Sequence, residues 1–508
     1  MFEIYTLEKK EDLVDFFKEI DEKDFQIRFP IDFNKISDTL DMIEYPMTIL
    51  YEPIYVDKVF RDSYYLFYAG KYNHIERDCK RLAFFKGNLD ETVFYSKSHQ
   101  DTTAVSENFV GIMILKPLNR GRMGRTILDP TKLKIPANHL RTTEFEFIVA
   151  DLPLKIKAFP FSSQDGETMT CAETTVWNIV EYFANRYSDY KTILASDITK
   201  TLENVSLERS LPTRGLPYDR VSQLLKCFGF SPRKYTNDGW EKVEFKRAFH
   251  YYIESGIPIA VGVKASPNIY HSIVCIGHGK QRQNYSKEIL TNIDEFNIPY
   301  VDSADLYNDY VIMDDNQAPY KVQSYDGLTK YDEPEVKTFV VPLYKRIFLE
   351  AQDAKKIVLK ILSHKNLSFL KMLPRMEEKI DEDNPLIFRL FLTSSRRFKS
   401  FRENNEQNDF KVGLYDTALY PKFVWVAELF TKSSYEKNQA YGEIIIDATA
   451  ARNSSVEESV IMLRYLSNIG YRLPKELIYD LLKRMERPTL GYNNNFKMYI
   501  NNLIEVSD

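Results

Sequence analysis

The chain has few cysteines, few glycines and no large excess of charge of one sign. Its four cysteines among 508 residues form no Cys-x-x-Cys pair, which excludes a disulfide framework and a common zinc pattern. Its 68 lysines and arginines nearly balance 73 acidic residues, so no basic field favours nucleic acid or an acidic membrane. We therefore expect no metal, no cofactor and no nucleic-acid partner.

Long apolar runs are also missing. No stretch approaches the roughly 18 uninterrupted apolar residues of a membrane span, and residues 1–12 carry acids among their apolar side chains. We expect neither a membrane span nor a signal peptide. Free thiols are typical of a reducing compartment, which predicts a cytoplasmic protein.

What the chain does have is ample material for packed cores. Apolar residues make up 44% and aromatic residues 14% of it, which excludes a disordered chain. The length predicts roughly three domains. We expect an α+β fold with an N-terminal α+β domain over residues 1–150, a central domain over 151–345 and a C-terminal α+β domain over 346–508.

One cysteine lies where a helix is expected to begin. Residues 161–170 are rich in turn formers, and the apolar residues that follow Cys171, among them Val176, Ile179 and Val180, recur at helical spacing. Cys171 then belongs to the first turn, where unpaired backbone N–H groups and the helix dipole favour thiolate over thiol. This position predicts a nucleophile.

A histidine is expected at the start of a buried strand farther along the chain. Gly256–Val263 predicts one strand, residues 265–268 a turn, and His271–Gly277 the returning strand of a hairpin. An imidazole in this position can take and return the proton of a nucleophile, while Gln164, upstream of Cys171, can donate a hydrogen bond to an oxyanion. We expect His271 to be the base and Gln164 the oxyanion donor.

A third short strand, Tyr310–Met313, is expected to deliver a carboxylate to that imidazole. Asp314 and Asp315 follow it, and strand alternation would place them on opposite faces, so only one is expected to orient His271. We expect Asp314 in this role, with Asp315 as the alternative. The polar stretch 279–309 must then loop out between two neighbouring strands.

These residues together resemble the papain-like cysteine peptidases, in particular the compact branch of bacteriocin-processing peptidases. The resemblance rests on Cys171 with Ala172 and Trp177, on Gln164 upstream, and on His271 at the head of an apolar strand. It covers residues 155–345 and implies a two-lobed catalytic domain, here flanked by two accessory domains. It also implies a bacterial-type thiol protease with a Cys-His-Asp triad and a protein or peptide substrate.

The same residues also fit other functions. Deamidation and acyl transfer to amines pass through the same thioester, so the triad does not separate them from peptide hydrolysis. A non-catalytic papain-like scaffold, or a protein that binds a peptide or nucleotide, is the alternative from a different class. A scaffold needs no reactive thiol at Cys171.

The flanks and the helical part of the centre yield further expectations. The basic segments Asn119–Thr126 and Ser394–Arg402 could meet a phosphate, an acidic partner or nucleic acid, but we interpret both as solvated loops. Cys227 and Cys275, inside apolar runs, are expected to be packing residues. Helices are expected over Leu7–Lys23, most of Phe60–Phe85, Leu216–Gly229, Trp240–Glu254, Ala351–Leu373, Val456–Ile469 and Lys475–Arg487, and strands over Phe109–Leu115, Pro385–Leu392, Lys422–Leu429 and Tyr441–Asp447.

Overall fold

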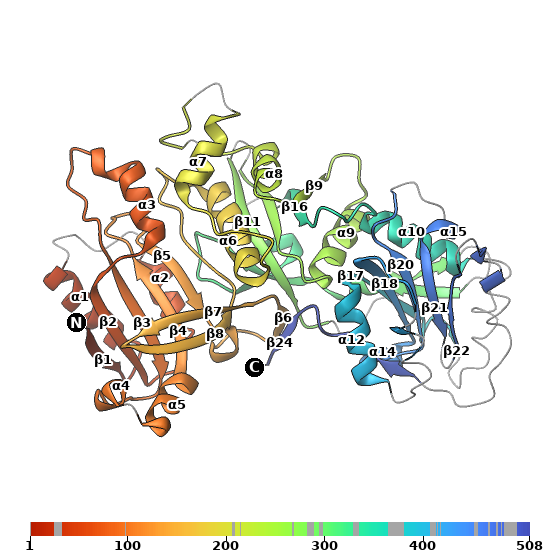
Figure 1. The fold of residues 1–508 in the computed structure, drawn as a ribbon, viewed down its shortest axis with the longest axis horizontal. Coiled ribbons are helices and arrows are strands. Elements are labelled where there is room, and N and C mark those ends of the chain that lie inside the picture. Colours follow the sequence, from red (N-terminus) through yellow and green to blue (C-terminus); the bar gives the residue numbers. More distant parts are fainter. Residues whose placement is uncertain are drawn as a thin grey trace.

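The computed structural model describes residues 2–507 apart from 25–32, 97, 206–208, 214, 267–268, 282–288, 294–297, 329–334, 364–379, 407–412, 414, 417, 452–455, 466–467, 474–475, 479 and 482–494. Helices and sheets are mixed along the chain, which confirms the expected α+β class. The described strands form three large sheets and two small ones. The large sheets are built mainly from the N-terminal, the central and the C-terminal parts of the chain (Figure 1).

The N-terminal sheet is an antiparallel meander in chain order. Its strands are β1 (Glu3–Leu7), β2 (Met47–Tyr55), β3 (Cys79–Lys86), β4 (Phe109–Leu115) and β5 (Met123–Leu128). Its helices are α1 (Asp12–Asp24), α2 (Phe33–Leu40), α3 (Lys58–Leu66), α4 (Thr92–Tyr95) and α5 (His99–Asn108). The expectation that most of Phe60–Phe85 is helical is wrong: α3 ends at Leu66, one short 3-10 turn follows over Tyr68–Gly70, and residues from Cys79 on form strand β3, which is buried on both faces up to Phe85.

The central sheet has the order β15-β14-β11-β10-β16-β9, with β6 attached to β11 and β24 to β6. Its strands are β6 (Asn138–Leu140), β9 (Ser231–Thr236), β10 (Ile259–Ser266), β11 (Ile269–Gly279), β14 (Asp309–Met313), β15 (Lys321–Ser324), β16 (Glu335–Leu343) and β24 (Ile504–Val506). The predicted hairpin is present as β10 and β11, paired antiparallel, while its turn lies partly outside the described residues. Because β24 pairs with β6, the C-terminal end of the chain returns to the middle of the molecule (Figure 1).

The central helices precede and interrupt this sheet. They are α6 (Cys171–Arg186), α7 (Ala195–Glu203), α8 (Tyr218–Cys227) and α9 (Lys242–Glu254). The helical spacing of Val176, Ile179 and Val180 predicts a single buried stripe, but helix α6 is buried from Ala172 to Tyr182, including the polar residues Glu173, Asn178 and Glu181. The reason is tertiary: α6 shares one core with residues of the N-terminal sheet and with Val274 of β11.

The C-terminal sheet has the order β12-β13-β17-β18-β20-β21-β22. Its strands are β12 (Thr291–Ile293), β13 (Ile298–Asp302), β17 (Leu386–Ser394), β18 (Phe423–Phe430), β20 (Gly442–Asp447), β21 (Val460–Tyr465) and β22 (Asn468–Tyr471), and its helices are α10 (Ala351–Leu362), α12 (Ser395–Asn405), α14 (Lys432–Glu436) and α15 (Val456–Ser459). Two small sheets complete the strands: β7 (Thr143–Val149) with β8 (Leu152–Ala158), and β19 (Gln439–Ala440) with β23 (Phe496–Lys497).

Several expectations for this part are corrected. Val456–Ile469 is a short helix followed by strand β21, and Ser394–Arg402 is mostly the packed helix α12. Arg402 of α12 is buried beside Glu428 and Glu443, which explains why this basic segment is not a solvated loop. The helix expected over Ala351–Leu373 is described to Leu362, and most of Lys475–Arg487 lies outside the described residues.

The sheets cross the expected domain boundaries. The 150/151 boundary falls in the turn of the β7–β8 hairpin, and β6, before it, pairs with the central strand β11. The stretch 279–309 leaves the central sheet as expected, yet it contributes β12 and β13 to the C-terminal sheet through the parallel pairing of β13 with β17. The three units therefore share strands and cores. In the described part of the chain, none of the helices is both long and apolar enough to cross a membrane.

Candidate functional site

Cys171 is the first residue of α6, as predicted. The preceding Thr170 is held against the first turn by Glu173: the Thr170 backbone N–H lies 3.1 Å from Glu173 Oε2, and the Thr170 hydroxyl donates to the same oxygen. These two hydrogen bonds tie Thr170 to the first turn and stabilise the start of the helix. The Cys171 thiol is partly exposed at the positive end of the helix dipole, whereas Cys79 and Cys275 are buried.

His271 lies on β11, in register with Val263 of β10, and its side chain is buried. Its Nε2 atom is 2.7 Å from Asp314 Oδ1. Burial would lower the pKa of His271, but hydrogen bonds to Asp314 and to Cys171, with the charges of Asp314 and Asp315, raise it well above its ordinary value. The fold therefore brings Cys171, His271 and Asp314 together from three separate elements.

Asp314 and Asp315 both face the imidazole. Asp315 Oδ1 is 3.5 Å from His271 Nε2, so the expectation that it points the other way is wrong. Strand β14 ends at Met313, and the two aspartates lie in the following turn, where strand alternation no longer applies.

The two carboxylates have opposite environments. Asp314 also accepts hydrogen bonds from the Asn316 backbone N–H (3.0 Å) and the Gln317 side chain (2.6 Å). Burial would raise the pKa of Asp314, but these hydrogen bonds and the contact with His271 hold that pKa below its ordinary value. Neither carboxylate oxygen of Asp315 has a hydrogen-bond partner in good geometry among the described residues, and burial raises its pKa to about 6.

Gln164 joins the same cluster from the N-terminal side. Its side-chain amide donates to Asn316 Oδ1 at 3.2 Å, and Asn316 Nδ2 is 3.4 Å from His271 Nε2. The segment before Gln164 pairs with the edge of the N-terminal sheet, where Ser163 N–H donates to the Met123 carbonyl. The structure therefore connects Gln164 to the imidazole through Asn316.

The segment expected to be a solvated turn, Asn119–Thr126, supports this arrangement. Gly121 has φ +69°, and a Cβ atom there would lie 2.2 Å from the Gln164 carbonyl oxygen. Arg122 is buried, and Arg125 lies 3.1 Å from Asp57, the N-cap residue of α3. The segment is a packed contact beneath Gln164.

Four further residues of the site have no clear signal in the sequence. Asn316 and Gln317 stand directly after the predicted aspartates, which is the only hint of them. Tyr218, from α8, has its hydroxyl 2.9 Å from Ser272 Oγ and interacts with Cys171. Lys35 donates to the Asp315 backbone carbonyl at 2.9 Å, across 280 positions of sequence. Long-range packing alone brings Tyr218 and Lys35 here.

The cluster also offers ligand atoms for a cation. One ligand atom each from His271, Asp314 and Asp315 lies within 4.8 Å of the others. Imidazole nitrogen and carboxylate oxygen suit zinc and similar metals. In the structure, however, His271 Nε2 and Asp314 Oδ1 are hydrogen-bonded to each other. A bound cation would have to replace that bond.

The other two cysteines inside apolar runs differ from each other. Cys275 is buried in β11, as expected for a packing residue, and burial raises its pKa above the ordinary value. Cys227 is exposed at the last residue of α8, so its expected packing role is wrong. The helix ends at Cys227, and Phe228 is its C-cap residue.

Comparison with known proteins adds no relative. The sequence matches no protein-family model, and none of the curated sequences is significantly similar to it. The functional interpretation therefore depends on the geometry described above.

Proposed function

We propose that the protein is a thiol hydrolase, a cysteine protease of papain-like architecture, acting on a protein or peptide. One observation carries this proposal: the Cys171 thiol, at the start of a buried helix, interacts with an imidazole whose Nε2 atom is held by Asp314. With Nε2 engaged, Nδ1 is the ring atom left for the sulfur. These are the parts that covalent acyl transfer requires.

In the proposed reaction the Cys171 thiolate attacks the carbonyl carbon of the scissile amide, and the carbonyl electrons move to oxygen. The intermediate collapses, the C–N bond breaks, and His271 gives its proton to the leaving amine. Water then attacks the thioester, passes a proton to His271 and releases the acid and the thiolate. The backbone N–H groups at the start of α6, with the Gln164 amide, are our candidates for stabilising the oxyanion.

The arrangement of the elements supports a two-lobed papain-like centre. The nucleophile begins helix α6, in a mainly helical part with α7 and α8, while the base and acid come from strands β11 and β14 of the central sheet. A site assembled at the junction of a helical and a β part is what the family resemblance implies. We propose in addition that the protein works in the cytoplasm, where its thiols stay reduced.

The N-terminal unit has a role in this proposal. Its strand edge at Met123 holds the segment before Gln164, and its Lys35 binds the backbone of Asp315. It therefore acts as a wall of the site rather than as a detached accessory domain.

Alkylation with iodoacetamide at about pH 6.5, mapped by mass spectrometry, tests the nucleophile. Cys227 is the internal control, because it is exposed but lies at the C-terminal, negative end of a helix. We expect Cys171 to react faster than Cys227, although it is less exposed. His271→Ala should slow the Cys171 reaction at least about tenfold and leave Cys227 unchanged. Faster labelling of Cys227 in the native protein would refute the nucleophile.

Peptide-library cleavage then distinguishes the reactions. Wild-type protein should release new amino termini, and Cys171→Ala should abolish this while Cys227→Ala does not. Ammonia release without chain cleavage would identify a deamidase, and amine-dependent products an acyltransferase. A peptide that binds but is unchanged would identify the scaffold alternative.

A chelator distinguishes the metal alternative. Because the proposed reaction needs no cation, treatment with EDTA should leave turnover and Cys171 alkylation unchanged. Loss of turnover on chelation, with recovery on adding Zn²⁺, would instead assign His271, Asp314 and Asp315 to a metal centre.

A further inference from the structure

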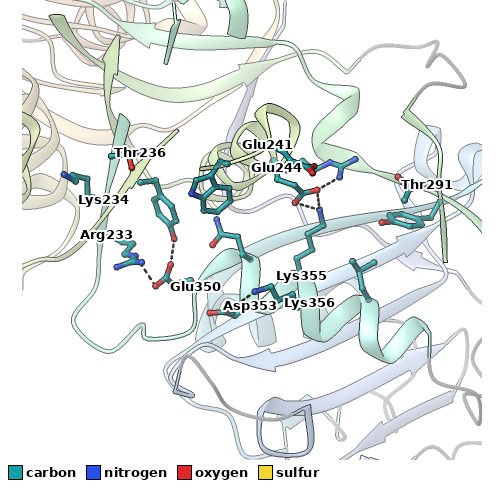
Figure 2. Close-up of a pocket in the computed structure, with 16 residues that line it drawn as sticks. Arg233, Lys234, Thr236, Glu241, Glu244, Thr291, Glu350, Asp353, Lys355 and Lys356 are labelled. Carbon is teal, nitrogen blue, oxygen red and sulfur yellow. Dashed lines mark hydrogen bonds and ion pairs between the residues drawn. The ribbon is translucent and has the colours of Figure 1, made fainter. Parts of the chain in front are cut away.

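Two cavities lie between the central and C-terminal units, and their charges are arranged differently. The larger, about 840 Å³, is lined by β9, α9 and α10 (Figure 2). Its charged side chains neutralise one another: Arg233 pairs with Glu350 at 3.0 Å, Lys355 with Glu244 at 2.8 Å and Lys356 with Asp353 at 3.5 Å. This cavity has its own internal counter-ions and gives no sign of a charged ligand.

The second cavity, about 500 Å³, is of the size of small-ligand sites. It lies between the end of α6, the segment after β16 and the start of α12. Among its lining side chains are four cations, Arg141, Arg396, Arg397 and Lys422, and a single acid, Asp189. None of the four cations forms an ion pair with an acid in the described part of the chain.

The positive charge is concentrated and partly buried. Arg141 is buried and donates to the Tyr182 hydroxyl at 2.6 Å and to the Asn502 backbone carbonyl, which are neutral partners. Burial lowers the pKa of Arg397, and the charges of Arg141 and Arg186 lower it further. Burial would raise the pKa of Tyr187, yet Arg141, Arg186 and Arg397 lower it to about 8. Such a cluster of cations favours an anion.

A helix start points into the same place. Helix α12 has 11 residues, and Ser394, Ser395, Arg396 and Arg397 at its beginning all line the cavity. The Ser394 side chain accepts a hydrogen bond from the Arg397 N–H at 3.4 Å, and the Ser395 N–H donates to the Lys422 carbonyl at 3.1 Å, which leaves the Arg396 N–H of the first turn for a ligand. Backbone N–H groups and the dipole at a helix start favour phosphate, and the arginines add bidentate donors.

Aromatic rings form another part of the lining. Tyr182, Phe183, Tyr187 and Tyr190 come from the end of α6 and the chain after it, and Tyr344 and Phe423 from the other side. Lys422 lies 4.2 Å above the Tyr344 ring. Rings beside cations form the combination that stacks a planar group and holds its charged substituent.

We propose that this cavity binds a phosphorylated aromatic ligand of the nucleoside monophosphate class, with the phosphate at Arg397, Arg141 and the α12 start and the base among the tyrosines. The four cations against one acid match a dianion better than a neutral or cationic ligand. The site is separate from Cys171: its lining residues on α6, Tyr182 and Phe183, come 11 and 12 residues after Cys171, which is about 17 Å along the helix. It therefore does not depend on the proposed hydrolase function.

Calorimetric titration of the full chain with AMP tests the proposal, with adenosine and inorganic phosphate as partial probes. We expect saturable AMP binding, weaker binding of adenosine, competition by phosphate, and a loss of affinity between about 50 and about 200 mM salt. Arg397→Gln and the exposed Lys422→Gln should each weaken AMP binding about tenfold or more, because each removes a charge-assisted contact. Lys437→Gln, an exposed lysine of the same unit outside the cavity, should bind as wild type.

Each outcome of the AMP titrations either supports or overturns the proposed site. Binding that falls in both cavity variants, with unchanged melting temperature and an unchanged Lys437 variant, supports the site. Absence of AMP binding up to about millimolar concentration overturns it. Adenosine binding as tightly as AMP, or loss of binding equally in the Lys437 variant, also overturns it, since neither result needs this cluster of cations.

Discussion

At the residue scale, environment rather than side-chain type separates two adjacent aspartates. Asp314 is bound by His271, Asn316 and Gln317, so its charged form is stabilised. Asp315 is equally buried but has no hydrogen bond in good geometry to its carboxylate within the described part of the chain. Burial of a carboxylate that lacks well-aligned donors favours its protonated form, which is why the pKa of Asp315 rises to about 6.

Asp315→Asn should stabilise the protein at pH 7. The folded state holds a proton on Asp315 up to about pH 6, whereas the unfolded chain releases it near 3.9, so the wild type loses stability as pH rises between these values. A shift of about two units corresponds to roughly 3 kcal/mol, and we expect a gain of roughly 1–3 kcal/mol at pH 7 and little at pH 4. Chemical denaturation at both pH values measures this.

Asp314→Asn is the matched control with the opposite sign. The Asp314 pKa is lowered on folding, so its contribution is present at pH 7 and is lost as pH falls through the folded-state value. The variant should therefore be less stable than the wild type at neutral pH, with a smaller difference in acid. Stabilisation by both substitutions at pH 7 would contradict the assigned environments.

At the element scale, the edge of the N-terminal sheet positions part of the candidate site. Strand β5 and the turn before it pair with residues 161–163, and Lys116 Nζ donates to the Ser163 carbonyl at 3.1 Å. The close approach depends on Gly121, whose φ of +69° and missing side chain leave room for Gln164. The start of α6 is thus anchored on one side by its own cap and on the other by this edge.

Gly121→Ala should destabilise the protein and disturb the site. The new Cβ would lie 2.2 Å from the Gln164 carbonyl oxygen and would occupy a left-handed conformation. Together we expect a cost of roughly 2–4 kcal/mol, with slower Cys171 alkylation. Gly166→Ala is the control, because Gly166 has φ +76° but open space for a Cβ. It should cost only about 1 kcal/mol and leave the alkylation rate unchanged; equal effects would mean that the close contact is unimportant.

At the scale of the whole molecule, buried ion pairs join the central and C-terminal units. Arg389 of β17 binds Glu254 of α9, with Nε 2.7 Å from Glu254 Oε1, and Glu428 of β18 at 2.8 Å. Arg402 continues the network to Glu428 and Glu443. All five side chains are buried, so each charge depends on its partners rather than on water.

Arg389→Met should destabilise the protein by about 3–5 kcal/mol, because it leaves the Glu254 and Glu428 charges buried without their partner. Since the network crosses between units, we expect one cooperative loss of structure in thermal unfolding rather than melting of the C-terminal unit alone. Lys399→Met, which removes a partly exposed cation 3.9 Å from Asp416, should change stability by less than about 1 kcal/mol. A similar small effect for both would show that the buried network is weakly coupled.

Local pattern predicted the parts of the site that lie on single elements. The helix beginning at Cys171, the hairpin carrying His271 and the strand ending before Asp314 are all present, because each is specified by its own periodicity and turn residues. The sequence pattern did not predict which charged residues are buried. Arg402 and Arg122 looked solvated, yet one is held by buried glutamates and the other lies in a packed turn.

The sequence by itself determined the α+β class, the local elements that carry Cys171, His271 and Asp314, and the start of α6, since these follow from interactions among neighbours in the chain. Only the tertiary structure decided that both aspartates face His271, that Tyr218 and Lys35 join the site, and that the N-terminal edge holds Gln164. The cationic cavity at the end of α6 was decided in the same way. Its residues range from Arg141 to Asn502, and no local pattern specifies which distant side chains meet when separate cores pack together.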